Sequence, residues 1–338
     1  MATSLPTPWG VTSASFTALG PRLAVDLAAM SQELGYRSYW TAEASGTESF
    51  SLLGACGEAA PGLALGTGII PVQVRSPLLA AMASATLQAL HPEQDILLGI
   101  GVSTPTITER WHGVPYGERP VARVRAYVTL LRALFDGKTI TADDGFWKLK
   151  GAALAVRLRD RKPKLILAAL NPKMLALAGE LADGVLLNYL PAAHVASSVA
   201  AIRAAEAAAG RPECSCKIYA YVHVGVADRE EARDKARRDV FSYAATEGYG
   251  NMMAKAGFAE EIAALRAARA NGDRAGSLAA LSERMIDAID FIGTAEQVRE
   301  HAGTYIAAGV EHGVVMPLPW GQDRRGTIEA TLAAVMGA

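Results

Sequence analysis

The sequence predicts an α/β fold, a (β/α)8 TIM barrel with insertions. Short strand-like runs alternate with longer runs rich in Ala and Leu, and this alternation is typical of βαβ units around a mainly parallel sheet. The pattern contains eight strands, each followed by a helix, which fits a closed barrel. An open, doubly wound sheet is the alternative, because periodicity does not show whether a sheet closes on itself.

The boundaries of these elements follow from apolar runs and from residues that start or stop helices. We expect strands over residues 10–16, 38–41, 63–70, 95–100, 164–169, 184–188, 217–226 and 313–316. We expect the main helices over residues 21–34, 50–60, 77–90, 121–135, 172–181, 191–209, 294–308 and 325–335. Thr294 and Gln297 form the pattern of a capping box at the start of one of these helices.

Two segments do not fit the repeating pattern. Residues 138–159 are irregular, with turn residues that indicate an inserted hairpin. Residues 228–290 are strongly charged and almost entirely helical in character. At about 150 residues per domain the length suggests two domains, but the strand count assigns residues 1–338 to a single barrel domain that carries these two insertions.

Composition and charge exclude several classes of protein. Hydrophobic residues make up 51% of the chain and charged residues 20%, which is typical of a globular fold rather than a disordered one. The net charge of −1 offers no electrostatic basis for binding nucleic acid or an anionic membrane. The uncharged N-terminal stretch is broken by prolines and lacks the basic start of a signal peptide. We therefore expect a soluble, cytoplasmic protein that acts on a small molecule.

The common local motifs of catalysis are missing. The segment 99–104 follows a strand but lacks the third glycine of a dinucleotide-binding fingerprint. Neither a Walker A sequence nor a nucleophile elbow occurs. The three cysteines, at positions 56, 214 and 216, are too few for a disulfide framework. Cys214 and Cys216 could bind a soft metal, but no second Cys or His pair lies at ligand spacing nearby, which favours ordinary strand-edge cysteines. We expect no metal site.

Candidate site residues instead follow the carboxyl ends of strands, where barrel active sites lie. Glu43 comes directly after the second strand, although it is equally well explained as an exposed loop carboxylate. Gly66 and Gly68 indicate a bulge or a close approach of backbone to a ligand, or else a plain strand-end turn. Asn171 and Pro172 open a helix whose N–H groups suit a phosphate, and helix capping alone explains them as well.

Two histidines are candidates for proton transfer. His112 lies just beyond the fourth strand, from where it reaches toward a cleft. His223 lies within the seventh strand, and the alternation of that strand points its side chain toward the barrel interior. The remaining histidines are better explained by helix-end or surface positions.

Several segments together resemble the luciferase-like superfamily of (β/α)8 oxidoreductases, and in particular its coenzyme F420-dependent branch, which includes methylenetetrahydromethanopterin reductase. The matching segments are 35–43 (GYRSYWTAE), 65–69 (LGTGI), 97–101 (LLGIG), 178–185 (AGELADGV) and 292–298 (IGTAEQV). Their order and spacing extend over nearly the whole chain. Together they are specific for the superfamily and less specific for the cofactor.

The resemblance implies where a cofactor binds. A flavin-like ring would lie at the carboxyl end of the barrel, backed by a cis peptide bond between Gly68 and Ile69 and lined by Val102 and Ser103. Backbone N–H groups of one further turn would hold the phosphate-bearing tail, and the residues of that turn are Ala168, Ala169, Leu170, Asn171 and Pro172.

The resemblance also implies that Glu43 lies beside the ring. Many relatives carry a histidine at the next position, where this chain has Ala44, so Glu43 is the candidate catalytic residue as well as a cofactor ligand.

The function implied is a coenzyme F420-dependent oxidoreductase that transfers a hydride between the deazaflavin and a small organic substrate. One alternative is an FMN-dependent monooxygenase of the same fold. A second alternative is a non-catalytic protein that binds F420. Relatives are often dimers, so a homodimer is expected, with no nucleic-acid or membrane partner.

Overall fold

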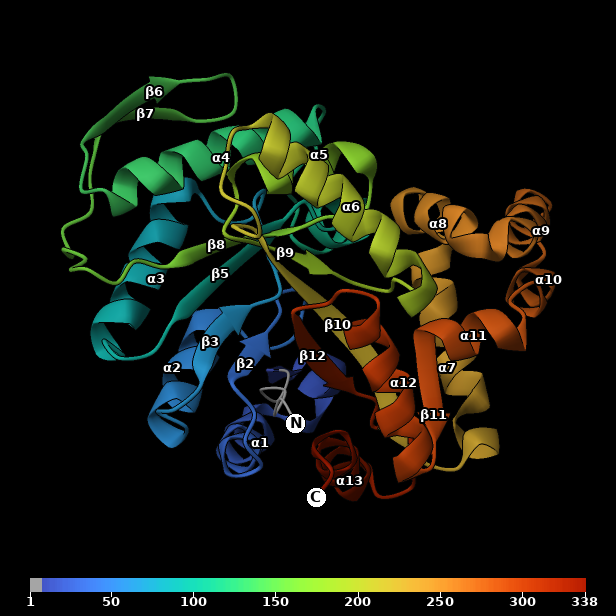
Figure 1. Ribbon diagram of the computed structural model, residues 1–338. Coiled ribbons are helices and arrows are strands. Elements are labelled where there is room, and N and C mark those ends of the chain that lie inside the picture. The colour runs from blue at the N-terminus through green and yellow to red at the C-terminus, as the bar shows by residue number, and fades with distance from the viewer. Residues whose placement is uncertain (1–7) are drawn as a thin grey trace.

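The computed structural model describes residues 8–338, in which parallel strands close into a barrel (Figure 1). Each strand pairs with the next one around the ring, and the last pairs with the first. The barrel strands are β1 (Trp9–Thr12), β2 (Ser38–Thr41), β3 (Ala64–Thr67), β5 (Ile96–Gly101), β8 (Lys164–Ala168), β9 (Gly184–Leu187), β10 (Lys217–Val226) and β12 (His312–Pro317). Closure confirms the (β/α)8 prediction and excludes the open, doubly wound sheet.

Helices follow these strands and cover the outside of the barrel (Figure 1). They are α1 (Pro21–Glu33), α2 (Ser49–Ala59), α3 (Pro77–Leu90), α4 (Pro120–Phe135), α5 (Pro172–Leu181), α6 (Ala192–Ala208), α12 (Ala295–Ala307) and α13 (Arg324–Met336). Proline occupies the first turn of several of them because its missing N–H is not needed there. The capping box predicted at Thr294 and Gln297 is present.

Two strand predictions need correction, and one further strand is present that the sequence did not predict. The first strand ends at Thr12 and not at residue 16, because the Thr12 hydroxyl accepts a hydrogen bond from Ala14 N and turns the chain into the 3-10 helix η1 (Ala14–Leu19). The strand expected over residues 63–70 is interrupted after Thr67 and continues as β4 (Ile70–Pro71). A short strand, β11 (Asp290–Gly293), follows the helical insertion and pairs in parallel with the carboxyl-terminal part of β10, residues His223–Val226. The helical segment expected over residues 228–290 therefore ends at Ile289.

Both insertions have the structure that the sequence predicts. Residues 138–159 contain an antiparallel hairpin of β6 (Ile140–Asp143) and β7 (Lys148–Ala152). The helical insertion consists of α7 (Arg229–Ala244), α8 (Glu247–Met253), η3 (Ala254–Phe258), α9 (Ala259–Ala270), α10 (Arg274–Ala279) and α11 (Glu283–Ile289), and it extends to one side of the barrel (Figure 1). Within the described part of the chain, no helix has the length and apolar character required to cross a membrane.

The core has two layers, one inside the barrel and one between the barrel and its helices. The interior cluster contains Trp40, Leu97, Ile166, Leu186, Tyr219, Tyr221, Val314 and Met316. Alternation along β10 places Tyr219 and Tyr221 inside, whereas Ile218 and Val222 belong to the outer layer. A side chain at Gly66 would lie 2.4 Å from the Trp40 ring. The glycine at position 66 therefore makes room for the protein's own tryptophan.

Candidate functional site

The predicted cofactor-binding residues lie at one end of the barrel. The strands are parallel, so the segments that follow β2, β3, β5 and β8 meet at their carboxyl ends. We call this end the mouth and define it by the predicted cofactor-binding residues, which are Glu43, Gly68, Ile69, Val102, Ser103, Ala168, Ala169, Leu170, Asn171 and Pro172. The fold therefore brings together residues that are spread over much of the first half of the chain.

The peptide bond between Gly68 and Ile69 is cis, as the resemblance implies. The Gly68 carbonyl oxygen accepts a hydrogen bond of 2.8 Å from the Tyr221 hydroxyl, which comes from the interior face of β10. Burial raises the pKa of Tyr221, so its hydroxyl keeps the proton that it donates. A Cβ atom at position 68 would lie 1.9 Å from this hydroxyl, which requires glycine there.

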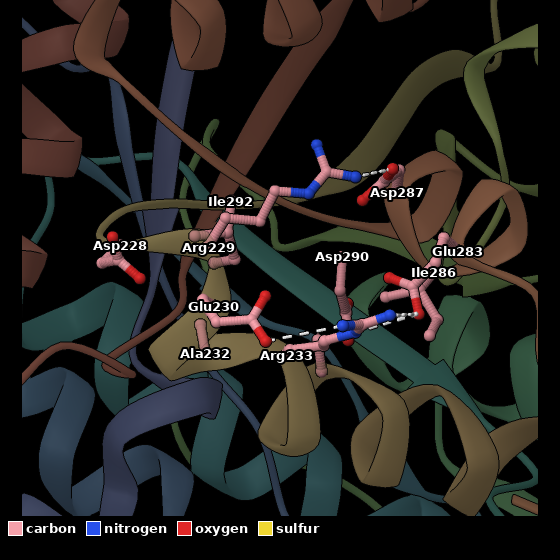
Figure 2. A pocket seen from close by; sticks show the side chains of 11 residues that line it. Asp228, Arg229, Glu230, Ala232, Arg233, Glu283, Ile286, Asp287, Asp290 and Ile292 are labelled. Carbon is pink, nitrogen blue, oxygen red and sulfur yellow. Dashed lines mark hydrogen bonds and ion pairs between the residues drawn. The ribbon is translucent and has the colours of Figure 1, made fainter. Parts of the chain in front are cut away.

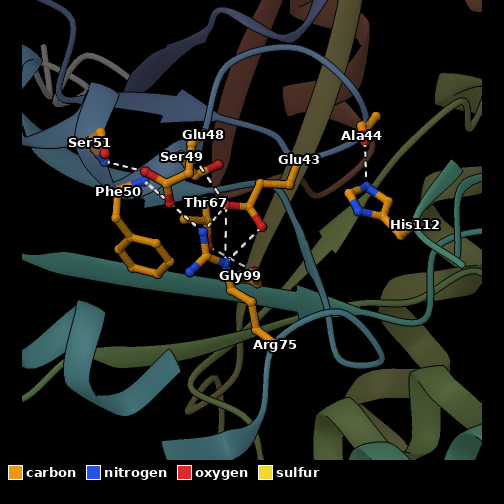
Figure 3. Close-up of polar contacts among 10 residues, drawn as sticks. All are labelled: Glu43, Ala44, Glu48, Ser49, Phe50, Ser51, Thr67, Arg75, Gly99 and His112. Atoms are coloured by element: carbon orange, nitrogen blue, oxygen red, sulfur yellow. Dashed lines mark hydrogen bonds and ion pairs between the residues drawn. The ribbon is translucent and has the colours of Figure 1, made fainter. Parts of the chain in front are cut away.

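Glu43 is not an exposed loop carboxylate, because it forms a two-pronged ion pair with Arg75 (Figure 3). Arg75 Nη2 lies 2.6 Å from Glu43 Oε1, and Arg75 Nε lies 2.9 Å from Oε2. The Glu43 side chain is only 11% exposed and the Arg75 side chain only 14%. The backbone N–H of Ser49 donates a further hydrogen bond to Glu43. Both oxygens of the Glu43 carboxylate therefore accept hydrogen bonds, and these bonds fix the orientation of the side chain.

Sequence reasoning missed Arg75, since nothing in the local pattern connects it with a carboxylate 32 residues away. Its guanidinium also binds Glu48, the N-cap of α2, and lies over the Phe50 ring at 5.0 Å (Figure 3). Its carboxylate partner Glu43 raises the pKa of Arg75. Arg75 therefore stays charged and joins the loop after β2 to the loop after β4.

His112 reaches the mouth from the loop after β5. It follows the short helix η2 (Thr106–Trp111), its side chain is exposed, and its Nε2 lies 2.6 Å from the carbonyl oxygen of Ala44 (Figure 3). A carbonyl oxygen only accepts hydrogen bonds, so Nε2 carries the proton in this contact. An imidazole is therefore present beside position 44, although the residue at that position is alanine.

The turn after β8 opens α5 as predicted. The Asn171 side chain accepts a hydrogen bond of 3.0 Å from Met174 N, and Pro172 is the first residue of the helix. The helix dipole and the first-turn N–H groups make such a start favourable for an anion. Across the mouth, Ile69 and Val102 are half-buried apolar side chains. Ser103 has a φ of 53°, in the left-handed region.

A second polar cluster lies where β9, β10, β11 and α7 meet. His223 Nδ1 is 3.0 Å from Asp290 Oδ1, and His223 Nε2 is 2.8 Å from Asn188 Oδ1. The Tyr189 hydroxyl donates to Asp239 Oδ2 at 2.7 Å. His223 shares the strand face of Tyr221, which confirms its predicted inward orientation. The sequence predicted neither Asn188 nor Asp290 as a partner of His223, because these residues lie far from it along the chain.

Burial controls the ionisation of this second cluster. It raises the pKa of Asp290 to about 8. Burial and the nearby charge of Asp290 raise the pKa of Asp239 to about 7. Burial also lowers the pKa of His223 to about 4, so its imidazole is neutral at pH 7.

Two cavities lie away from the mouth. One of about 490 Å³ opens at the amino ends of the strands and is lined by charged residues that include Lys164, Asp183 and Lys217. The other, of about 440 Å³, lies between α7 and α11 (Figure 2). Asp290 is among its lining residues, so this second cavity adjoins the buried cluster.

Comparison with known proteins identifies the family. The sequence model of the family described as luciferase-like monooxygenase matches residues 1–312. The chain belongs to this family of enzymes. It is 31% identical over 271 residues to 5,10-methylenetetrahydromethanopterin reductase of Archaeoglobus fulgidus, an alignment that covers 78% of this chain and 80% of that protein. The family resemblance inferred from the sequence is thereby confirmed.

Solved structures of the family share the fold. The chain is similar to the coenzyme F420-dependent tetrahydromethanopterin reductase of Methanopyrus kandleri, with a TM-score of 0.80 and 20% identity over 98% of this chain and 99% of that one. It is also similar to an F420-dependent secondary alcohol dehydrogenase, with a TM-score of 0.73 and 16% identity over 98% and 99% of the two chains. At these identities the structural likeness concerns the fold alone.

Proposed function

We propose that this chain is a coenzyme F420-dependent oxidoreductase that transfers a hydride between the deazaflavin and a small organic substrate. Its relative in Archaeoglobus fulgidus is a methylenetetrahydromethanopterin reductase, and two structurally similar proteins are F420-dependent. The observation that carries the proposal is the convergence of the predicted cofactor-binding segments at the mouth, although they come from different strand ends.

The residues of the mouth suit such a cofactor. The half-buried side chains of Ile69 and Val102 offer apolar surface for the faces of a flat ring. The start of α5, capped by Asn171, offers backbone N–H groups and the positive end of a helix dipole for an anionic tail. Once bound, the deazaflavin supplies the carbon that accepts or donates the hydride, and the protein orients it and excludes water.

We assign different roles to the polar residues of the mouth. Glu43 would contact the ring as an anion, and Arg75 would position it through the paired hydrogen bonds. His112 would hold or release the proton that accompanies hydride transfer, because its imidazole lies beside Ala44. This arrangement would compensate for the missing histidine at position 44.

Parallel titrations of the purified apoprotein with F420 and with FMN test the choice of cofactor. We expect F420 to bind at least about tenfold more tightly, which corresponds to about 1.4 kcal/mol. A tenfold preference for FMN would contradict the proposal and favour the FMN-dependent monooxygenase, the alternative that the family description supports. Tight F420 binding without turnover of any carbonyl, imine or alcohol substrate would instead indicate the non-catalytic F420-binding protein.

We also propose that residues 1–338 form one domain and that two copies form a homodimer in the cytoplasm. Support for a dimer comes from α3, where the apolar side chains of Leu79, Met82 and Leu90 are 45%, 50% and 61% exposed. The unpaired cysteines fit a reducing compartment. Light scattering after gel filtration measures the mass, and replacement of Met82 by Glu should shift a dimer toward the monomer.

A further inference from the structure

The cluster of His223 and Asp290, both buried, and Asp239, which is half-buried, has the composition of a metal site. The three residues come from β10, α7 and β11, and their potential ligand atoms all lie within 4.8 Å of one another. His223 and Asp290 are each only 1% exposed. One imidazole nitrogen and two carboxylates are ligands that divalent transition metals accept.

The hydrogen bonds around His223 determine which of its nitrogens is available to a metal. Asn188 Oδ1 accepts a hydrogen bond of 3.0 Å from the backbone N–H of Tyr189, so the amide oxygen is the atom that faces His223 Nε2. An amide oxygen only accepts, so Nε2 carries the hydrogen and Nδ1 presents its lone pair beside Asp290 Oδ1. Histidines that bind metals are oriented in this way by a partner on the other nitrogen.

Over residues 8–338, no Lys or Arg side chain forms an ion pair with Asp239 or Asp290. Asp290 Oδ2 is buried and has no hydrogen-bond partner among the described residues. The nearby arginines of α7 are paired elsewhere, since Arg229 binds Asp287 and both Arg233 and Arg237 bind Glu283. Buried carboxylates without such a partner are costly unless a proton or a cation joins them.

A route for a cation exists on the side of α7 and α11. Asp290 lines the cavity of about 440 Å³ between these helices. Five carboxylate residues and two arginines line this cavity (Figure 2). The excess of negative charge raises the local concentration of cations.

We propose that His223 Nδ1, Asp239 and Asp290 bind one divalent transition-metal ion of the Zn²⁺ class. The two carboxylates balance the charge of the ion, and the neutral imidazole completes a set of three protein ligands. The ion connects β10, β11 and α7 and, through Asn188 and Tyr189, holds the segment that follows β9. None of the three ligands belongs to the residues that define the mouth, so zinc binding can be measured without the cofactor.

Zinc binding by the full chain tests the proposal. Protein stripped with EDTA is titrated calorimetrically with ZnCl2, and bound zinc is counted after gel filtration. We expect one zinc ion per chain, and at least about tenfold weaker binding in His223→Gln and Asp290→Asn. Asp234→Asn, an exposed carboxylate of α7 outside the cavity, and Cys214→Ser, an exposed thiol, are matched controls that should bind as the unmodified protein does.

Absence of saturable zinc binding by the unmodified protein would overturn the proposal, as would unchanged binding in Asp290→Asn. A second measurement does not depend on folded variants. Zinc added to the unmodified protein should raise its Tm, because a ligand that binds only the folded state stabilises it, and EDTA should reverse the shift. Binding of Mg²⁺ or Ca²⁺ but not of Zn²⁺ or Co²⁺ would contradict the assigned class of metal.

Discussion

The Tyr221 hydroxyl donates a hydrogen bond of 2.8 Å to the Gly68 carbonyl oxygen, and the space that it occupies is the space that a side chain at position 68 would need. This contact links the interior of β10 to the mouth on the opposite side of the barrel. The Thr12 hydroxyl lies 3.4 Å from the same phenol oxygen. Three barrel segments therefore meet around one buried hydroxyl.

Replacement of Gly68 by Ala should destabilise the protein, because the added Cβ would lie 1.9 Å from the Tyr221 oxygen. Overpacking of this kind costs about 1–3 kcal/mol. Urea denaturation of Gly68→Ala, Tyr221→Phe and the double variant measures the coupling. We expect the double variant to be less destabilised than the sum of the two single variants, since removal of the hydroxyl makes room. Strict additivity would show that the clash does not occur.

Replacement of Glu43 by Gln should lower F420-dependent turnover, because the neutral amide cannot form the charged pair with Arg75. We expect kcat to fall by about tenfold or more, with a smaller change in KM. Glu58→Gln, on the exposed face of α2, is the matched control and should retain full activity. If Glu43→Gln turns over at the rate of the control, Glu43 is not the catalytic residue.

Replacement of His112 by Gln preserves a hydrogen-bond donor for the Ala44 carbonyl but removes a group that exchanges protons. A general acid or base contributes about 10²- to 10⁴-fold to a rate, so kcat should drop within this range while F420 affinity stays unchanged. Arg110→Gln, an exposed neighbour on the same turn, controls for general damage to the loop. A kcat in His112→Gln equal to that of the Arg110→Gln control would exclude this role.

Replacement of Asn171 by Asp separates helix capping from anion binding. Aspartate caps a helix as well as asparagine does, so the stability of α5 should be retained. The added negative charge should nevertheless repel an anionic cofactor tail and weaken F420 binding by about five- to tenfold at low salt. Thr294→Asp changes the cap of α12 instead and should leave the affinity for F420 unchanged. Equal affinities in both variants would mean that Asn171 only caps its helix.

Stability should decrease as the solution is acidified, in part through His312. Burial lowers the pKa of His312 from 6.5 to about 3, and its Nε2 lies 2.7 Å from Ser38 Oγ. Between these pH values the unfolded chain binds a proton that the folded protein does not. The contribution of neutral His312 to the free energy of unfolding is therefore fully present above pH 6.5. It is lost as the pH falls toward 3, by up to about 1.4 kcal/mol per pH unit.

Urea denaturation at a series of pH values measures this dependence. His312→Gln should be less stable than the unmodified protein near pH 7, and the gap should narrow toward pH 4. Two stability curves that run parallel over this range would exclude His312 as a source of the pH dependence.

The sequence by itself determined the order of strands and helices, the two insertions and the family. These properties depend on periodicity and on end signals such as the Asn171 cap and the Thr294 capping box, which act within a few residues. It also placed Glu43 and the Gly68–Ile69 segment at the end of the barrel where they lie. The end of the first strand was wrong, because a local turn through the Thr12 hydroxyl stops β1 early.

Only the tertiary structure decided what these residues contact. The pairing of Glu43 with Arg75 and the approach of His112 to Ala44 join loops that follow different strands. The glycines at positions 66 and 68 make room for Trp40 and Tyr221, which local pattern reading cannot distinguish from room for a ligand. The cluster around His223 joins residues 67 positions apart. Such contacts depend on the closure and stagger of the barrel, and closure is a property of the whole sheet that no short segment carries.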